Sequence, residues 1–232
     1  MPTVAIIPAR GGSRGLAGKH LRLLGGEPLL AHTVRAGLAA RRIDRVLVST
    51  DDPRIRSAAL RLGAEAPFLR PAELATDEAP TMPVIAHAVD WLEATGLAVD
   101  LVVTLQATTP LRGPDEIDAV VALLEDAHVQ SAVTVARLAW PASVVGWLDE
   151  DGALRLMLPV PRDARRQASA PAVRITGGVY ATRRELLRAG RLLDDCPAAL
   201  AVDAAAGIDI DTDDDLLRAR RALRAARHRG AP

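Results

Sequence analysis

A loop rich in glycine and positive charge follows the first apolar segment of the chain. The stretch "IIPARGGSRGLAGKH" (6–20) carries Arg10, Ser13, Arg14 and Lys19 around adjacent glycines. Glycine lets backbone N–H groups approach an anion closely, and the basic side chains add charge and donors. Lys19 is the only lysine of the chain; every other basic position is arginine. The loop predicts a polyphosphate-binding site. The alternative is a glycine-rich turn whose arginines are solvated.

Two common phosphate-binding motifs do not fit this loop. A P-loop needs glycine, four residues and then Gly-Lys-Ser/Thr, but Ser13 and His20 stand at two of its obligatory positions. The dinucleotide motif Gly-x-Gly-x-x-Gly also fails, because Gly11 and Gly12 are adjacent. A nicotinamide-dependent oxidoreductase is therefore a weak hypothesis.

A second chemical signal is the acidic segment "IDIDTDDD" (208–215). In a strand, residues two apart share a face, so Asp209 and Asp211 would point together. Paired carboxylates at a strand end suit Mg²⁺, which takes a few carboxylates plus substrate phosphates. The three following aspartates fit the N-terminus of a helix, and simple capping is the alternative for the first two.

Two more polar clusters follow predicted strands or precede predicted helices. They are "LRPAELATDEAPT" (69–81) and "LQATTPLR" (105–112). Helix and strand-end capping would explain each cluster alone, but Gln106 stands where a base edge or a ribose could be bound. The polar residues of the two clusters are Arg70, Asp77, Thr81, Gln106, Thr108, Thr109 and Arg112.

The anion loop and the paired carboxylates complement each other chemically. The loop would hold a triphosphate, and the carboxylates would hold its metal ion. This combination fits nucleotidyl transfer, in which positioning and neutralisation of charge do most of the work.

Composition narrows the class of protein. The chain of 232 residues has 29 basic and 29 acidic residues and 2% aromatic residues, which argues against nucleic-acid and membrane partners. No apolar run approaches the ~18 residues of a membrane span. The single cysteine, Cys196, excludes an internal disulfide framework and a cysteine-rich zinc site. We expect a passive thiol in a cytoplasmic protein.

Strand and helix patterns alternate along most of the chain. This alternation predicts one α/β domain over residues 1–232, with a doubly wound, mostly parallel sheet. The pattern changes over about 139–175, where "VVGWLDEDGALRLML" predicts a hairpin turning near Asp151 and Gly152. We expect this segment to be an insertion that projects from the sheet. Ligands of open α/β sheets bind beyond the carboxyl ends of the strands, where the four polar segments fall.

The chain resembles the cytidylyltransferases that activate acidic sugars, the CMP-N-acylneuraminate (sialic acid) synthetases and their relatives. The four segments "IIPARGGSRGLAGKH", "FLRPAELATDEAPT", "LQATTPLR" and "IDIDTDDDL" match in order and span nearly the whole chain. The resemblance implies a Rossmann-like nucleotidyltransferase fold, CTP as substrate, Mg²⁺ as cofactor and release of pyrophosphate. It also implies a homodimer formed through the insertion, which would lie on the acceptor side.

The resemblance also implies roles for individual residues. Lys19 and Arg10 would be catalytic, with Lys19 neutralising charge on the departing pyrophosphate, and Asp209 and Asp211 would bind Mg²⁺. The implied nucleotide-binding residues are Arg10, Gly11, Gly12, Ser13, Arg14, Lys19, His20, Thr81 and Gln106. The implied acceptor-binding residues are Gln106, Arg166, Arg174 and Thr176.

Three positions depart from the family pattern. His20 replaces an asparagine, Ala107-Thr108-Thr109 stands in place of Pro-Thr-Ser, and Thr176-Gly177-Gly178 replaces Asn-Gly-Ala. The last change removes the expected acceptor-binding asparagine. A nonulosonic acid is the leading acceptor, and a small phosphonate or carboxyphosphonate of secondary metabolism is the alternative. A nucleotide-binding protein without turnover is a third hypothesis.

Overall fold

An interior strand of the main sheet forms from the first apolar run of the sequence. The computed structural model describes residues 2–12, 15–157 and 172–229, and β1 (Thr3–Pro8) lies inside its main sheet. Both edges of β1 are paired in parallel, with β4 (Arg45–Ser49) and with β5 (Leu101–Thr104). Such a strand is buried on both faces, which is why its sequence is continuously apolar.

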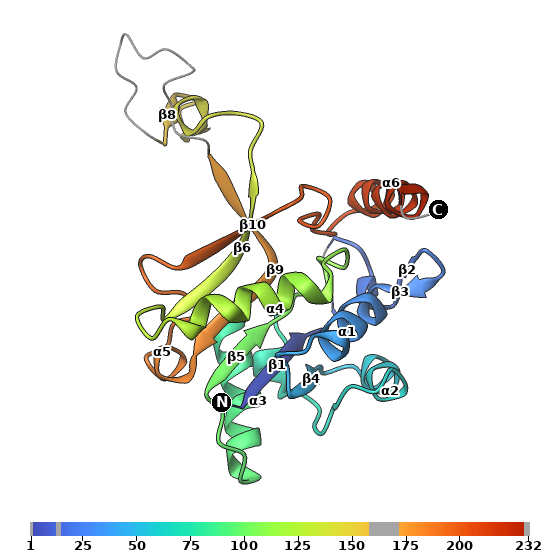
Figure 1. Ribbon diagram of the computed structural model, residues 1–232. Helices are drawn as coiled ribbons and strands as arrows, with labels where there is room; N and C mark the ends of the chain where they lie inside the picture. The colour runs from blue at the N-terminus through green and yellow to red at the C-terminus, as the bar shows by residue number, and fades with distance from the viewer. Residues whose placement is uncertain (1, 13–14, 158–171, 230–232) are drawn as a thin grey trace.

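The main sheet has six strands in the order β10-β6-β9-β5-β1-β4 (Figure 1). Strand β6 (Ser131–Arg137) pairs in parallel with β10 (Ala198–Val202), whereas β9 (Val173–Arg183) is antiparallel to both of its neighbours, β5 and β6. The predicted α/β fold with a mostly parallel sheet is confirmed, with β9 as its antiparallel strand.

Helices cover both faces of the sheet. Alternate residues of β1 join two hydrophobic clusters: Ala5 and Ile7 pack with α1 (Leu29–Ala39), α2 (Pro53–Arg61) and α4 (Pro114–Ala122), and Val4 and Ile6 pack with α3 (Thr81–Ala94) and α5 (Arg184–Arg188). This is the period-two pattern of a strand between two layers. None of the described helices is long and apolar enough to cross a membrane.

The last helix, α6 (Asp213–Arg229), packs beside the loop that follows β1. Its Leu216 and Ala219 share a small apolar cluster with Leu16, Leu24 and Ile210. The two-residue strands β2 (Leu23–Leu24) and β3 (Glu27–Pro28) form a turn next to it. Four short 3₁₀ segments complete the described elements: η1 (Lys19–Leu21), η2 (Ala72–Leu74), η3 (Leu123–Glu125) and η4 (Ala142–Val144).

One sequence expectation about strands was wrong, and one strand of the sheet was not expected. Residues 208–211 form no strand; the Ile210 N–H instead donates to the carbonyl of Thr108 at 2.8 Å, so one loop supports another. Strand β10 was not expected, because its alanine-rich sequence "AALAV" has weak strand propensity. Pairing with β6 decides its conformation.

The predicted hairpin is present and projects from the sheet (Figure 1). Strands β7 (Gly146–Leu148) and β8 (Leu154–Leu156) pair antiparallel, and Gly152 in the connecting turn has φ of +78°. A positive φ is a conformation that glycine adopts without steric cost. The projecting segment returns to the sheet through β9, which begins at Val173.

Candidate active site

A cavity of about 240 Å³ opens at the carboxyl edge of the central strands. Three of the four polar segments contribute to its wall: the loop after β1, the segment leading into α3, and the loop after β5. The cavity is lined by Pro8, Arg10, Lys19, His20, Arg70, Leu74, Thr76, Asp77, Ala79, Thr81, Val84, Gln106, Ala107 and Thr108. Residues separated by nearly 100 positions therefore meet around one polar space.

The loop after β1 is held against the neighbouring strand by Asp51. The Gly11 N–H donates to the Asp51 carboxylate at 2.9 Å, and Asp51 lies just beyond β4. Asp52, not Asp51, caps α2, accepting from the Arg54 N–H at 2.7 Å. Gly12 is exposed. The parallel pairing of β1 with β4 brings Asp51 to the loop after β1 instead of to the helix terminus.

Lys19 joins the loop to the acidic segment near the end of the chain. Its Nζ donates to Oδ1 of Asp211 at 2.7 Å, and the Lys19 side chain is 15% exposed against 64% for Asp211. The same two segments touch at Gly15, where an added Cβ would lie 2.3 Å from the carbonyl oxygen of Asp211. Glycine at 15 is thus required for this close approach.

Arg10 reaches across the mouth of the cavity. One guanidinium nitrogen donates to the carbonyl of Thr76 at 2.8 Å, and the other lies 2.6 Å from the Asp77 carboxylate. Thr81, the first residue of α3, lines the same wall.

Arg70 is a buried cation on the cavity wall, and it is not among the binding residues that the family resemblance implies. Its guanidinium donates to the hydroxyl of Ser49 at 3.1 Å and also to the Ser49 carbonyl. Its pKa is lowered to about 10, chiefly by burial; the Asp51 carboxylate opposes this shift, and Arg10 adds to it. Arg70 therefore stays protonated near neutral pH. The sequence signal that could have identified Arg70 is its place in the polar segment 69–81, directly after the apolar residues Phe68 and Leu69.

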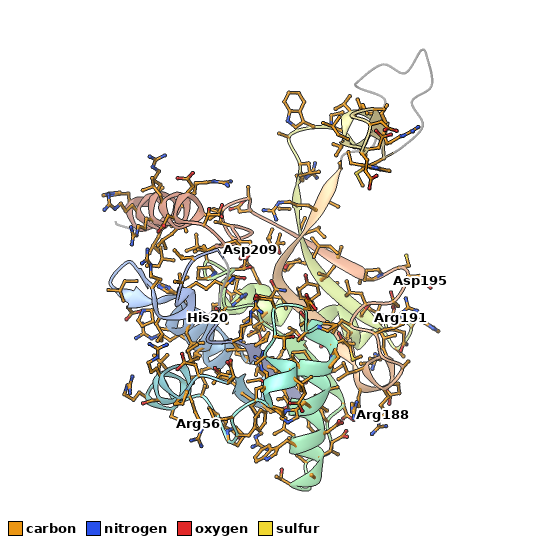
Figure 2. All side chains as sticks on the ribbon, turned by 180° about the vertical axis from the view of Figure 1, so that it is seen from behind. His20, Arg56, Arg188, Arg191, Asp195 and Asp209 are labelled. Carbon is orange, nitrogen blue, oxygen red and sulfur yellow. The ribbon has the colours of Figure 1, made fainter. Side chains whose placement is uncertain are left out.

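His20 is buried beside three cations. It is 4% exposed in η1, and its Nδ1 has no hydrogen-bond partner within the described residues. Burial lowers the pKa of His20 to about 4, and Lys19, Arg70 and Arg10 contribute in the same direction. The imidazole is consequently neutral near pH 7. Figure 2 shows it in the segment after β1, with Asp209 before the start of α6.

Arg112 supports the loop after β5 from beneath. Its guanidinium donates to the Gln106 carbonyl and, at 3.1 Å, to the hydroxyl of Thr33 on α1. It is 4% exposed, and burial lowers its pKa to about 9. Arg112 thus fixes the backbone that presents Gln106 and Thr108 to the cavity.

The two predicted metal ligands lie in different surroundings. Oδ1 of Asp209 is buried without a hydrogen-bond partner in the described chain, whereas Asp211 is exposed and bonded to Lys19. Neither residue lines the cavity. Within residues 2–12, 15–157 and 172–229, no cluster of three or more histidine, cysteine or acidic side chains could hold a metal ion. Among the described residues, no third side chain of these types therefore completes a metal-binding cluster with Asp209 and Asp211.

The predicted acceptor-binding residues are not all at the cavity. Thr176 is 2% exposed, and its hydroxyl lies 2.7 Å from that of Thr134 on β6. Arg174 donates to the carbonyl of Gly207 at 2.6 Å. Of the members of this set that the structure describes, only Gln106 lines the cavity. Ser13, Arg14 and Arg166 lie outside the described residues.

These observations define an α/β protein whose sheet edge carries a polar cavity lined by three cations among the described residues, suited to a polyanionic ligand. Comparison with known proteins identifies the family of enzymes to which this chain belongs. The family model described as "Cytidylyltransferase" matches residues 4–189. The chain belongs to the cytidylyltransferase family, and it is an enzyme of the nucleotidyltransferase class.

Individual relatives cover nearly the whole chain. It is 31% identical to the CMP-N,N'-diacetyllegionaminic acid synthase of Legionella pneumophila, over 91% of this chain and 92% of that protein. It is 33% identical to a 3-deoxy-manno-octulosonate cytidylyltransferase of Anaeromyxobacter dehalogenans, over 95% and 97%. In fold it resembles the CMP:2-keto-3-deoxy-manno-octonic acid synthetase complexed with CTP, with a TM-score of 0.73, 22% identity and coverage of 97% and 100%.

The buried state of His20 predicts a pH-dependent stability. Between its ordinary pKa of 6.5 and its folded value of about 4, the unfolded chain binds a proton that the folded chain does not. The free energy of unfolding therefore falls as pH falls through this window. From about pH 7 to about pH 4.5, we expect the wild type to lose roughly 2 kcal/mol more than His20→Asn, by urea unfolding.

The exposed His128 offers a matched control for this measurement. His128→Asn should lose as much stability as the wild type over the same interval. Equal pH dependence in the wild type and His20→Asn would contradict the neutral, buried state of His20.

Proposed function

We propose that this enzyme transfers CMP from CTP to an acidic acceptor, a nonulosonic acid, with release of pyrophosphate. The observation that carries the proposal is the convergence of four segments on one site. Arg10 and Lys19, Arg70 and Thr81, and Gln106 line one cavity. The fourth segment is joined to it by the contact of 2.7 Å between Lys19 and Asp211. The legionaminic acid synthase among the relatives supports a nonulosonic acceptor, and the octulosonate enzyme supports the wider class of acidic sugars.

Two of the cations that line the cavity, Arg10 and Lys19, would bind the triphosphate. Arg10 and Lys19 are only partly exposed, so a bound phosphate would interact with them in a medium less screening than water. His20 contributes no positive charge to the cavity near pH 7, because its imidazole is neutral there. The cavity of about 240 Å³ is smaller than the ~300–1,000 Å³ of typical ligand sites. It would enclose part of the nucleotide, with Thr81 and Gln106 on its wall.

The reaction is an in-line displacement at the α-phosphorus. An acceptor oxygen forms a new bond to phosphorus as the bond to the bridging oxygen of pyrophosphate breaks, and the acceptor proton leaves. Lys19 would stabilise the negative charge that grows on the leaving pyrophosphate. A compact ammonium on a flexible stem can follow a moving charge, which a planar guanidinium held at two nitrogens does less well.

Mg²⁺ fits the carboxylates that the structure presents. The buried oxygen of Asp209 without a hydrogen-bond partner is a ready acceptor for a cation, and the exposed Asp211 lies two residues away. Mg²⁺ commonly uses one or two carboxylates plus substrate phosphates and water. When bound, the ion would neutralise phosphate charge, and Asp209 and Asp211 would hold it.

The acceptor side supports a second candidate. The hydroxyl of Thr176 is engaged by Thr134 and also accepts the Gly178 N–H at 3.1 Å. Position 176 therefore directs no polar group toward an acceptor, although the family pattern has asparagine there. This favours a small phosphonate or carboxyphosphonate acceptor as the alternative to a nonulosonic acid.

Pyrophosphate release from CTP, measured with a panel of acceptors, tests the proposal. We expect CTP- and Mg²⁺-dependent release with a nonulosonic acid, and formation of a CMP-sugar by mass spectrometry. Release only with phosphonates would select the alternative acceptor. Absence of release with every acidic acceptor would contradict CMP transfer.

Lys19→Ala should reduce turnover by roughly 10²-fold, the scale for loss of one group that stabilises a transition state. The free energy of unfolding should change by less than about 1 kcal/mol, because the partner Asp211 is mostly exposed. The nearby Arg22→Ala is the matched control: Arg22 pairs with the exposed Asp213 at 2.8 Å, outside the cavity, and should retain turnover within about twofold. Normal turnover in Lys19→Ala would refute the role of Lys19.

We also propose that the insertion of about 139–175 forms a homodimer and lies beside the acceptor. Its described apolar side chains are unusually open: Trp140, Val144, Trp147, Leu148, Leu154 and Met157 are each more than half exposed. A concentration of such side chains typically marks a protein interface. The acceptor-binding roles of Arg166 and Arg174, and the cytoplasmic location, remain predictions from sequence.

Charge placed on the hairpin should separate the proposed dimer. Leu148 and Leu154 are cross-strand partners, so the double change Leu148→Asp and Leu154→Asp puts two charges on one face. Light scattering should give a mass near 24.5 kDa for this variant and near twice that for the wild type. Leu38 on α1 and Leu60 on α2 are also exposed, and the double change Leu38→Asp and Leu60→Asp is a control that should stay dimeric. Unchanged mass in the hairpin variant would contradict the proposal.

A further inference from the structure

Arg10, the proposed phosphate ligand at the mouth of the cavity, is held by an acidic side chain. Its guanidinium lies 2.6 Å from the Asp77 carboxylate and donates to the Thr76 carbonyl at 2.8 Å. Both Arg10 and Asp77 line the cavity. The Asp77 carboxylate is therefore bound to the same guanidinium group of Arg10 that a phosphate oxygen would bind.

Asp77 comes from a segment that the sequence places far from Arg10. This segment runs from η2 (Ala72–Leu74) to the start of α3, and its residues form one wall of the cavity. Asp77 is the acidic residue of the described cavity lining, against three cations. It thus lowers the net positive charge that an incoming triphosphate would meet.

The contact between Arg10 and Asp77 differs from those of the two buried arginines near the cavity, Arg70 and Arg112. Arg70 and Arg112 are held by neutral hydroxyl and carbonyl oxygens, and they keep their full charge. Arg10 is bound instead by an opposite charge. The pair is partly open to solvent, with side chains 28% and 33% exposed. Ion pairs of this exposure are weak, so a multiply charged phosphate can replace Asp77 on Arg10.

We propose that Asp77 competes with the nucleotide triphosphate for Arg10 and thereby sets the affinity of the site for CTP. The inference rests on the proposed function, because it takes Arg10 to be a ligand of the triphosphate. Asp77 acts here through Arg10, so it is an affinity-setting residue with no role in the chemical step. The Thr76 carbonyl would keep Arg10 in place when the carboxylate is displaced.

Calorimetric titration of CTP into the full chain, with Mg²⁺ and without acceptor, tests the proposal. Asp77→Asn keeps the shape and a hydrogen-bond acceptor but removes the competing charge. We expect it to lower the Kd for CTP by about two- to fivefold, the range of a partly exposed ion pair. Glu78→Gln removes one charge from the neighbouring, exposed position and should change the Kd less than about 1.5-fold.

A double-mutant cycle separates competition from a general charge effect. In an Arg10→Ala background, Asp77→Asn should produce no gain, because the contested group is gone. An equal gain in that background, or in Glu78→Gln, would overturn the inference in favour of a general field effect. A weaker Kd in Asp77→Asn would overturn it in favour of Asp77 as a support for Arg10. In these outcomes wild-type binding of CTP still stands, whereas a wild type that does not bind CTP would refute the proposed function as well as this inference.

Discussion

Strand β1 pairs in parallel with β4 on one edge and β5 on the other, and this arrangement brings three loops to one edge of the sheet. Parallel strands end together, so the residues that follow them meet in space even when they are far apart in sequence. Arg10, Asp51 and Gln106 become neighbours in this way. The supporting contacts depend on the same register: Asp51 holds the Gly11 N–H, and Arg112 holds the Gln106 carbonyl.

The arginines of this region fall into two groups according to their partners. Arg70 and Arg112 are buried and bound by neutral oxygens. They fix the backbone around the cavity, because they donate to the carbonyls of Ser49 and Gln106. Arg10 and Lys19 are more open and are paired with the carboxylates of Asp77 and Asp211. A charge held by an opposite charge at the surface is easily exchanged for another anion. The second group is therefore the one that we propose to bind the triphosphate, and the first group fixes the backbone around it.

The two halves of the proposed reaction differ in how fully the chain supports them. The nucleotide half has a cavity, cations and a supporting frame. On the acceptor side, the hydroxyls of Thr134 and Thr176 satisfy each other, and Thr134 also accepts the Val179 N–H at 3.0 Å where the register between β6 and β9 shifts. This network stabilises the irregular pairing of the two strands. It explains why threonine at 176 serves the sheet, and it removes that side chain from the set available to an acceptor.

The sequence by itself determined the α/β class, the hairpin with its turn at Gly152, most of the helices, and the segments from which the cavity is built. Those features follow from local signals: apolar periodicity, glycine and proline positions, and polar clusters at strand ends. Tertiary structure alone decided the partners of those clusters. No local pattern indicates that Lys19 meets Asp211, that Arg10 meets Asp77, or that Asp51 leaves helix capping to Asp52 and holds the loop after β1. It also decided that residues 208–211 stay irregular while the alanine-rich β10 forms a strand, because a strand requires a hydrogen-bonding neighbour, and only the folded chain supplies one.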